Sequence, residues 1–264
     1  MQALNLFKIG GELINDPTAL THFLKGFATL DGPKILVHGG GKIATEMEAA
    51  LGIESTLIEG RRVTGEATLR VVTMVYAGLI NKNMVATLQS MQCNAIGLCG
   101  ADADIVPAIK REVKDQDYGF VGDPDSSAIN TTAIRLMIEN GIVPVLSSIT
   151  HDRKGNLLNT NADTVSCVLA VALSREYEVS LKYCFDKRGV LRDVNDPHSV
   201  LPSITPSQYH SLKNEGLIAG GMIPKLDNGF LAVKCGVHHV SISHTRDITT
   251  STDPKHHAGT TLCL

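Results

Sequence analysis

Four charged side chains occupy positions from which they could act together on an anionic group. Lys8 lies near the end of a short apolar run, directly before two glycines, and Lys225 follows a second pair of glycines. Arg62 ends a short extended run, and Asp163 lies where a helix is expected to begin. Taken singly, each basic residue is more simply a solvated surface residue, and Asp163 a residue at the start of a helix. Together, and beside glycines that let a ligand approach the backbone, they favour the handling of phosphate.

A run of three glycines, residues 39–41, is the strongest local signal for ligand binding. It follows residues 34–37, which read as a short buried strand, and it precedes residues 42–51, whose apolar positions have helical spacing. The first N–H groups of a helix are unpaired and the helix dipole is positive there, so such a place attracts anions. The alternative is a tight turn that binds nothing. Three consecutive glycines cost backbone entropy, which favours ligand contact.

Two familiar nucleotide-binding patterns do not fit this glycine run. The Walker A motif requires a glycine where Leu36 stands and a serine or threonine where Ile43 stands. The dinucleotide fingerprint requires a third glycine where Ala44 stands, and no acidic residue closes a suitable second strand. The sequence therefore disfavours an oxidoreductase built on a Rossmann domain.

Strand and helix patterns alternate along almost the whole chain, which indicates an α/β fold layered around a mostly parallel sheet. Such sheets bind ligands at one edge, where the strands end. The first half of the chain ends near residue 174, which predicts an N-terminal lobe over residues 1–175 and a C-terminal lobe over 176–264. Strands are expected over residues 4–9, 34–37, 95–99, 142–149, 179–185, 239–243 and 260–264, with a hairpin over 105–113 and 118–121. Helices are expected to begin at Asp16-Pro17, at Thr64 and within residues 159–163, and to span 42–51, 131–139, 206–215 and 220–236.

The composition is that of an ordinary soluble globular protein. The net charge is −3, so nothing draws the chain generally to nucleic acid or to an anionic membrane. No apolar run is read as membrane-spanning, and no secretory signal is visible. The six cysteines form no C-x-x-C pair, which predicts reduced thiols and a cytoplasmic protein. The histidine pairs at 238/239 and 256/257 lack partners at metal-ligand spacing, so no metal site is expected.

Five short motifs, in this order, resemble the motif set of the acetylglutamate kinases, a branch of the amino acid kinase family. The resemblance covers nearly the whole chain. Other branches, such as aspartate kinase, carbamate kinase and UMP kinase, differ around the second glycine loop and the Arg-Val-Thr segment. The motifs are Lys8-Ile9-Gly10-Gly11, His38-Gly39-Gly40-Gly41, Gly60-Arg61-Arg62-Val63-Thr64, Asn159-Thr160-Asn161-Ala162-Asp163 and Gly220-Gly221-Met222-Ile223-Pro224-Lys225.

The resemblance implies a three-layer αβα sandwich and an enzyme that phosphorylates the γ-carboxylate of an N-acylated glutamate with MgATP, a step of arginine synthesis. The N-terminal lobe would bind the acyl-glutamate and form a dimer, and the C-terminal lobe would bind ATP. Mg²⁺ would be carried on the nucleotide, because the chain shows no dedicated cage of carboxylates.

The same resemblance implies roles for individual residues. Lys8 and Lys225 would stabilise charge on the transferring phosphoryl group, and Asp163 would hold both lysines in place. These roles agree with the chemistry, since a carboxylate is already a nucleophile and the transfer then depends on positioning and on neutralising charge. The acyl-glutamate would be bound by Gly40, Gly41, Arg62 and Asn159. The phosphates would lie against Gly10 and Gly11, and the nucleoside would be surrounded by Asp186, Lys187, Arg188, Gly189, Val190, Leu191, Leu217, Ile218 and Ala219.

Two alternatives stay open beside this interpretation. Arg61 stands where the family usually has an aliphatic residue, so the acyl group could be larger and more acidic than acetyl, with succinyl as the first candidate. Neighbouring strand residues point to opposite faces, however, and Arg61 could simply be solvated. The other alternative is a non-catalytic amino-acid sensor on the same fold, against which the intact lysines and aspartate speak.

The family resemblance also bears on assembly and regulation. Arginine-inhibited members carry an extra helix before the first strand and use it to link dimers into hexamers. Here the first strand begins near Leu4, so we expect a homodimer that is insensitive to arginine. The long apolar helix expected to start near Thr64 would be its dimer face.

Overall fold

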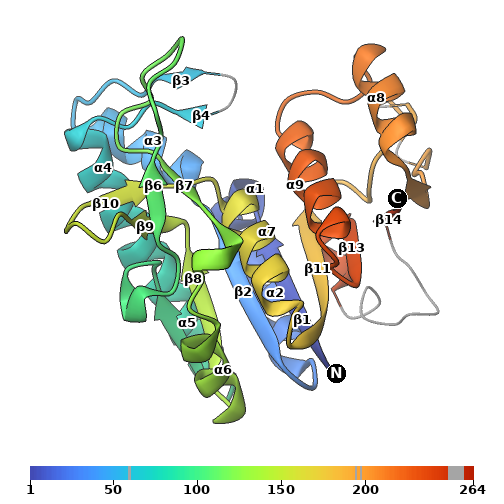
Figure 1. Ribbon diagram of the computed structural model, residues 1–264, viewed down its shortest axis with the longest axis horizontal. Coiled ribbons are helices and arrows are strands. Elements are labelled where there is room, and N and C mark those ends of the chain that lie inside the picture. Colours follow the sequence, from blue (N-terminus) through green and yellow to red (C-terminus); the bar gives the residue numbers. More distant parts are fainter. Residues whose placement is uncertain (59–60, 194, 197, 249–258) are drawn as a thin grey trace.

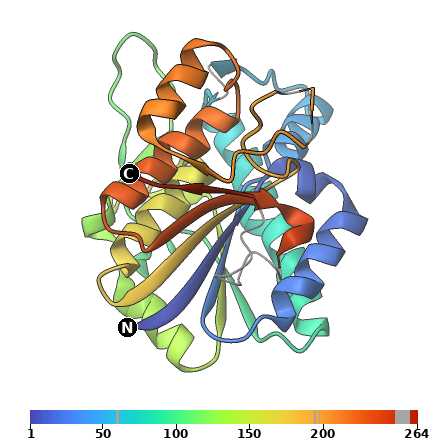
Figure 2. The same cartoon turned by 90° about the vertical axis from the view of Figure 1, so that its right-hand side faces the viewer.

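The centre of the molecule is an eight-stranded sheet with helices on both faces (Figure 1 and Figure 2). A computed structural model describes the chain apart from residues 59–60, 194, 197 and 249–258. All neighbouring strands are parallel except β13 and β14, so the predicted αβα sandwich with a mostly parallel sheet is confirmed. From one edge to the other, the strands are β12 (Ser203–Ile204), β14 (Thr260–Leu262), β13 (His239–His244), β11 (Tyr177–Phe185), β1 (Gln2–Ile9), β2 (Lys34–His38), β8 (Val143–Ser147) and β5 (Ala95–Leu98).

Two apolar cores lie on opposite faces of the sheet. The first is completed by α6 (Thr131–Glu139), α7 (Ala162–Leu173), α8 (Pro206–Asn214) and α9 (Met222–Lys234). The second is completed by α1 (Gly11–Asn15), α2 (Pro17–Thr29), α3 (Gly41–Ala50) and the long helix that begins at Glu66. Asp16 caps α2 and Pro17 is its first residue, as expected.

The alternation of side chains along the central strand β1 determines the direction of the Lys8 side chain. Leu4 and Leu6 pack into the first core and Phe7 and Ile9 into the second, because successive strand residues face opposite sides. Lys8 continues the Leu4–Leu6 face, so its side chain is directed toward α7. Pairing with β11 and β2 places Lys8 beside Tyr183 and Val37, close to the carboxyl ends of all three strands.

Helix α7 is almost entirely buried and fixes Asp163 in its first turn. The Asn161 side chain caps the helix by accepting from the backbone N–H of Asp163 at 2.7 Å and of Thr164 at 3.4 Å. The carbonyl of Asp163 also accepts from the Tyr183 hydroxyl at 3.3 Å. Both backbone polar groups of Asp163 are therefore hydrogen-bonded to side chains, which limits where its carboxylate can lie.

The long helix expected from Thr64 is present, but its start and its geometry differ from the prediction. Its N-cap is Gly65, because the Thr64 hydroxyl instead donates to the carbonyl of Arg62 at 3.0 Å. The helix comprises α4 (Glu66–Val72), the π-helix η1 (Thr73–Ile80) and α5 (Asn81–Ser90). By length and hydropathy alone, Glu66–Ser90 could cross a membrane. One side of it packs into the second core, and 44% of its most apolar window is buried inside the fold.

Two strand predictions were wrong in their bounds. Residues 142–149 do not form one strand, because the chain leaves the large sheet after Ser147 and pairs as β9 (Ile149–His151) with β10 (Leu157–Asn159). The hairpin lies at β6 (Ala108–Lys110) and β7 (Gly122–Pro124), shifted from the expected runs. The strand β12 was not expected at all. The remaining elements are β3 (Leu57–Ile58), β4 (Arg61–Arg62), η2 (Asp102–Asp104), η3 (Ser126–Ala128) and η4 (Thr245–Asp247).

Candidate active site

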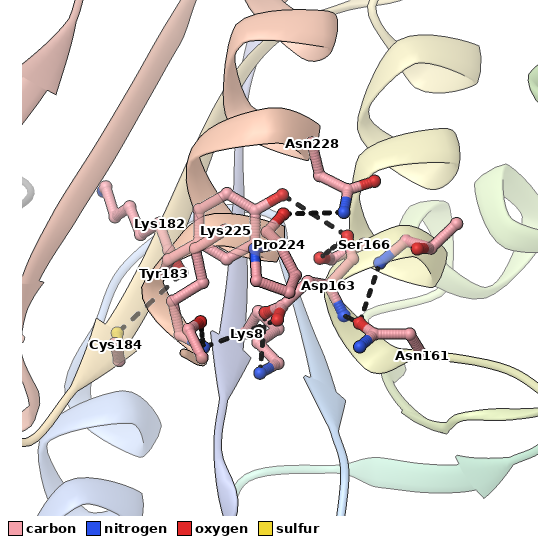
Figure 3. Close-up of polar contacts among 12 residues, drawn as sticks. Lys8, Asn161, Asp163, Ser166, Lys182, Tyr183, Cys184, Pro224, Lys225 and Asn228 are labelled. Carbon is pink, nitrogen blue, oxygen red and sulfur yellow. Dashed lines mark hydrogen bonds and ion pairs between the residues drawn. The ribbon is translucent and has the colours of Figure 1, made fainter. Parts of the chain in front are cut away.

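The site is centred on Asp163, whose carboxylate lies between two ammonium groups (Figure 3). Lys8 Nζ lies 2.7 Å from Asp163 Oδ1, and Lys225 Nζ lies 3.4 Å from Asp163 Oδ2. The three residues are only 4–6% exposed. The structure thus brings together the three residues that the sequence singled out, from β1, α7 and α9.

This cluster carries one excess positive charge. Burial raises the pKa of Asp163, but the nearby charges of Lys8 and Lys225 more than offset it, so the pKa is lowered and the carboxylate stays ionised. Burial and the charge of Lys8 lower the pKa of Lys225, and Asp163 opposes that effect. The two buried ammonium groups share a single carboxylate, so their positive charge is incompletely paired. An anion that entered the site would neutralise this excess positive charge.

Lys225 is held by its own helix turn. Gly221 is the N-cap of α9, and its carbonyl accepts from Lys225 Nζ at 3.1 Å. The same ammonium lies 5.0 Å from the centre of the Phe185 ring, at the end of β11. The lysine therefore reaches back over the amino end of its helix to the strand ends where Lys8 lies.

A cavity of about 700 Å³ opens in front of the Lys8–Asp163 pair. The predicted substrate and phosphate residues that line it are Gly10, Gly11, Gly40, Gly41, Arg62 and Asn159. Lys225 lines a neighbouring cavity, together with Lys8, the Gly10–Gly11 turn and Asp186. The two cavities share Lys8 and this glycine turn, so the cluster lies where they meet.

The glycine run owes its composition to the long helix behind it. A Cβ on Gly40 would lie 2.3 Å from Ile80 Cδ1 and 2.9 Å from Tyr76 Cδ1, so a larger residue would require these buried side chains to move. Gly40 is also the N-cap of α3, and no side chain among the described residues caps that helix. The first N–H groups of α3 are therefore open to a ligand in the cavity.

Arg62 lies in the site but is already engaged by protein groups. Its Nη1 forms a buried ion pair with Glu48 and a hydrogen bond with Ser55. Its Nη2 donates to the carbonyl of Gly41 at 2.8 Å and to Thr45 Oγ1 at 2.7 Å. In this state Arg62 braces the first turn of α3 and does not present a free guanidinium edge. Gly60, the first residue of this motif, and Glu59 before it lie outside the described residues.

Several residues of the cleft were not foreseen from the sequence. Tyr76, on the long helix expected only as a dimer face, lines the cavity beside Arg62. Asp227 and Asn228 follow Lys225 on α9, a proximity in the sequence that could have indicated them. Arg111 had no such signal, because it reaches the cavity only through the hairpin β6–β7, where it pairs with Asp123.

Of the nine residues predicted around the nucleoside, four line a cavity. Asp186, Lys187, Arg188 and Leu191 line a third cavity, which shares Asp186, His244 and Arg246 with the cavity lined by Lys225. Val190 and Ile218 are instead buried in the first core, and the Val190 N–H donates to Thr260 Oγ1 at 2.8 Å. Gly189 lets β14 approach closely, since a Cβ there would lie 2.6 Å from Thr260 Oγ1. Leu217 and Ala219 flank Ile218 and line none of the cavities described above.

The described residues offer no cluster of three or more histidine, cysteine or acidic side chains that could hold a metal ion. His256 and His257 lie outside those residues. The carboxylate of the cluster itself does not fit a metal, because each of its oxygens faces an ammonium group. The protein side of the site is therefore cationic.

Glycine turns and buried lysines at the carboxyl edge of a mostly parallel sheet are suited to binding a phosphate group and stabilising its charge. A model described as the amino acid kinase family matches residues 4–244, and the chain belongs to that family. The acetylglutamate kinase of Cytophaga hutchinsonii is 51% identical over 263 residues, which cover 99% of both chains. The acetylglutamate kinase of Phocaeicola vulgatus is 50% identical over 242 residues, covering 92% of this chain and 93% of the relative. Among solved structures, smu.665 from Streptococcus mutans UA159 is 26% identical, has a TM-score of 0.76 and matches over 98% of each chain.

Proposed function

We propose that the protein transfers the γ-phosphoryl group of ATP to the γ-carboxylate of N-acetyl-L-glutamate, giving the acyl phosphate and ADP, in arginine synthesis. The names of the curated relatives support this substrate. The observation that carries the proposal is the buried pair of lysines on Asp163, with one positive charge in excess of the carboxylate. A phosphoryl group in transfer spreads negative charge over its oxygens, and fixed cations stabilise that charge.

The reaction needs little from the protein beyond the positive charge of these two lysines. The γ-carboxylate of the substrate is already ionised, so no general base is required. One of its oxygens attacks the γ-phosphorus, the bond from that phosphorus to the bridging oxygen breaks, and ADP leaves with the electron pair. Lys8 and Lys225 reach the transferring group from different elements, and Asp163 keeps both ammonium groups in register.

The glycine turns position the two reactants. The N–H groups at the start of α3 would bind oxygens of the γ-carboxylate and of the transferring phosphoryl group. Gly10 and Gly11 would lie against the phosphates of ATP. The side-chain amide of Asn159 is fixed because its Nδ2 donates to Thr64 Oγ1 at 3.0 Å. Its side-chain oxygen, Oδ1, would then accept from the acyl amide N–H of the substrate. Mg²⁺ belongs to the substrate MgATP, and the cavity lined by Asp186, Lys187, Arg188 and Leu191 would take the nucleoside.

Trapping of the acyl phosphate tests this function directly. With ATP, Mg²⁺, N-acetyl-L-glutamate and hydroxylamine, the wild-type protein should form a hydroxamate, and Lys8→Ala should form at least a hundred-fold less. Binding of both ligands without hydroxamate would indicate a non-catalytic sensor. Turnover of a nicotinamide cofactor without ATP would indicate an oxidoreductase.

A second candidate substrate, N-succinyl-L-glutamate, is favoured by one wall of the cleft. Arg61 is exposed and lines the cavity, whereas its neighbour Arg62 is engaged by Glu48. A carboxylate at the end of the acyl chain would find a charge-assisted partner in Arg61 that an acetyl group cannot use. The ratio of kcat/KM for the two substrates, measured in wild type and in Arg61→Leu, decides the question. A preference for acetyl, or an unchanged ratio in the variant, excludes the succinyl substrate.

We infer that the protein works as a homodimer through its long helix. Met74 and Leu79, on η1, are 57% and 48% exposed although the opposite side of the helix packs on the sheet. Exposed apolar side chains on such a helix are typical of a subunit interface. We further propose that residues 1–175 form the acyl-glutamate and dimer lobe and 176–264 the nucleotide lobe, in a cytoplasmic enzyme. The six unpaired cysteines support a reducing compartment.

A further inference from the structure

A buried histidine directly before the glycine run makes two hydrogen bonds that phosphoryl transfer does not itself use. His38 is 0% exposed, and its Nδ1 lies 2.9 Å from the carbonyl oxygen of Gly39. Its Nε2 lies 3.0 Å from Asn81 Nδ2. Asn81 is also 0% exposed, and it donates to the carbonyl oxygen of Val145 at 2.9 Å. The ring is thus held on both nitrogens.

These partners allow one arrangement of protons. The Gly39 carbonyl can only accept, so Nδ1 of His38 carries the hydrogen, and the amide of Asn81 donates, so Nε2 is bare. The orientation of that amide is set by Lys82, whose Nζ lies 3.3 Å from Asn81 Oδ1. Burial lowers the pKa of His38 to about 4; the bond to Gly39 opposes the shift and the charge of Lys82 adds to it. The ring is therefore neutral around pH 7.

The bond to Gly39 sets the direction of the next peptide unit. In a trans peptide the C=O and N–H groups point in opposite directions. Because the Gly39 carbonyl points at His38, the N–H of Gly40 points away from it, toward the cavity that both glycines line. Within the described residues this N–H donates to no acceptor. The Gly40 N–H is therefore a hydrogen-bond donor that is available to a ligand in the cavity.

The long helix holds the glycine run from behind. Residues four and five apart lie on the same side of a π-helix, so η1 directs Tyr76, Ile80 and the following Asn81 toward the run. Tyr76 and Ile80 fill the space beside Gly40, and Asn81 fixes His38. The helix therefore sets both the place of the run and the tautomer of the histidine.

We propose that His38 is a positioning residue: held by Asn81 in its neutral Nδ1–H form, it fixes the Gly39 carbonyl and so aims the Gly40 N–H at the oxygen that gains charge during transfer. The proposal rests on the proposed kinase function. It assigns to His38 an effect on kcat rather than on nucleotide binding, because its hydrogen bonds touch the glycine run and not the nucleotide cavity.

Two matched variants separate this role from a merely structural one. His38→Asn keeps an amide donor near the place of Nδ1, whereas His38→Gln carries its amide near the place of Nε2 and leaves Gly39 without its donor. We expect His38→Gln to lower kcat by about tenfold to a hundredfold with a KM for MgATP within about threefold of wild type, and His38→Asn to stay within about fivefold in kcat. Equal losses in the two variants, or a loss confined to KM, would overturn the proposal.

The tautomer can be measured in the unaltered protein, independently of any activity. Nitrogen-15 spectra of histidine-labelled protein between pH 5 and 8 should show His38 protonated on Nδ1, bare on Nε2 and unchanged across the range, with His38→Asn identifying the signal. A proton on Nε2, or titration within this range, would overturn the proposal even if the protein is a kinase. Absence of hydroxamate in the wild type would instead overturn the proposed function, and the catalytic role of His38 with it.

Discussion

Replacing Asp163 by Asn should weaken the fold and the activity together, whereas replacing Lys225 by Met should weaken only the activity. The wild-type cluster holds two ammonium groups and one carboxylate, all buried. Asp163→Asn leaves both buried cations without a counter-charge. Lys225→Met leaves the Lys8–Asp163 pair at 2.7 Å with no charge in excess.

The magnitudes follow from the energetics of buried charge. Removing one partner of a buried ion pair costs about 3–5 kcal/mol, so the free energy of unfolding of Asp163→Asn should fall by about that much near neutral pH. For a chain of this size that lowers Tm by roughly 6–20 °C. Lys225→Met should stay within about 1 kcal/mol of wild type, because it also removes a desolvated charge that Lys8 repels. Both variants should lose about two to four orders of magnitude in kcat.

The pH dependence of the free energy of unfolding tests the same reasoning. The pKa of Asp163 is lowered in the folded protein, so its contribution to stability is complete above its unfolded pKa of about 4 and is lost as the pH falls through the folded value. The gap between wild type and Asp163→Asn should therefore close in acid. Differential scanning calorimetry of both variants, with the hydroxamate assay alongside, makes the comparison. The reasoning is refuted if Lys225→Met is destabilised as much as Asp163→Asn, or if Asp163→Asn keeps wild-type kcat.

Three further predictions concern the lysine, the glycine run and the proposed interface. Burial and Lys8 lower the pKa of Lys225, and the ammonium form is the active one, so kcat/KM for MgATP should fall on the alkaline side through a pKa below the ordinary 10.5; a limb at or above that value contradicts this. Gly40→Ala should lower kcat by at least tenfold and reduce Tm, because its Cβ would meet Ile80 at 2.3 Å; wild-type kinetics would show that the run can shift freely. The double variant Met74→Glu and Leu79→Glu should sediment as a monomer while wild type sediments as a dimer, and a wild-type monomer or a dimeric variant would remove the long helix from the interface.

Much of the fold could be predicted because local signals and tertiary packing agree. Asp16-Pro17 marks the start of α2, and Asn161 marks the start of α7, where its side chain caps the helix. The apolar runs that became β1 and β11 read clearly as strands because both faces of each are buried. For the Lys8–Asp163–Lys225 cluster, the neighbouring glycines and the expected helix start indicated only phosphate handling, and the family resemblance implied that Asp163 holds both lysines.

What the sequence did not show depends on contacts between distant residues. Glu48 is charged, which ordinarily indicates a solvated face, yet it is 0% exposed because Arg62 pairs with it from another segment. The π-helical turn before Asn81 has no local pattern, and its side chains are placed by the glycine run they touch. Val190 was expected at the nucleoside, but the approach of β14 draws it into the core. Each of these needs the partner in space before it can be recognised.

The central place of β1 has a consequence for how the protein comes to be folded in a cell. In the chain, β1 is followed soon by its neighbour β2, but its other neighbour is β11, which begins only at Tyr177. At translation rates of about 5–20 residues per second, one edge of β1 waits roughly 8–35 s for its partner. During that time an apolar strand edge is open to other chains, a known route to aggregation. Lys8 is therefore made well before its surroundings are complete, and a chain truncated before β11 would contain Lys8 and Asp163 but lack Lys225 and the strand that pairs with β1 on its other side.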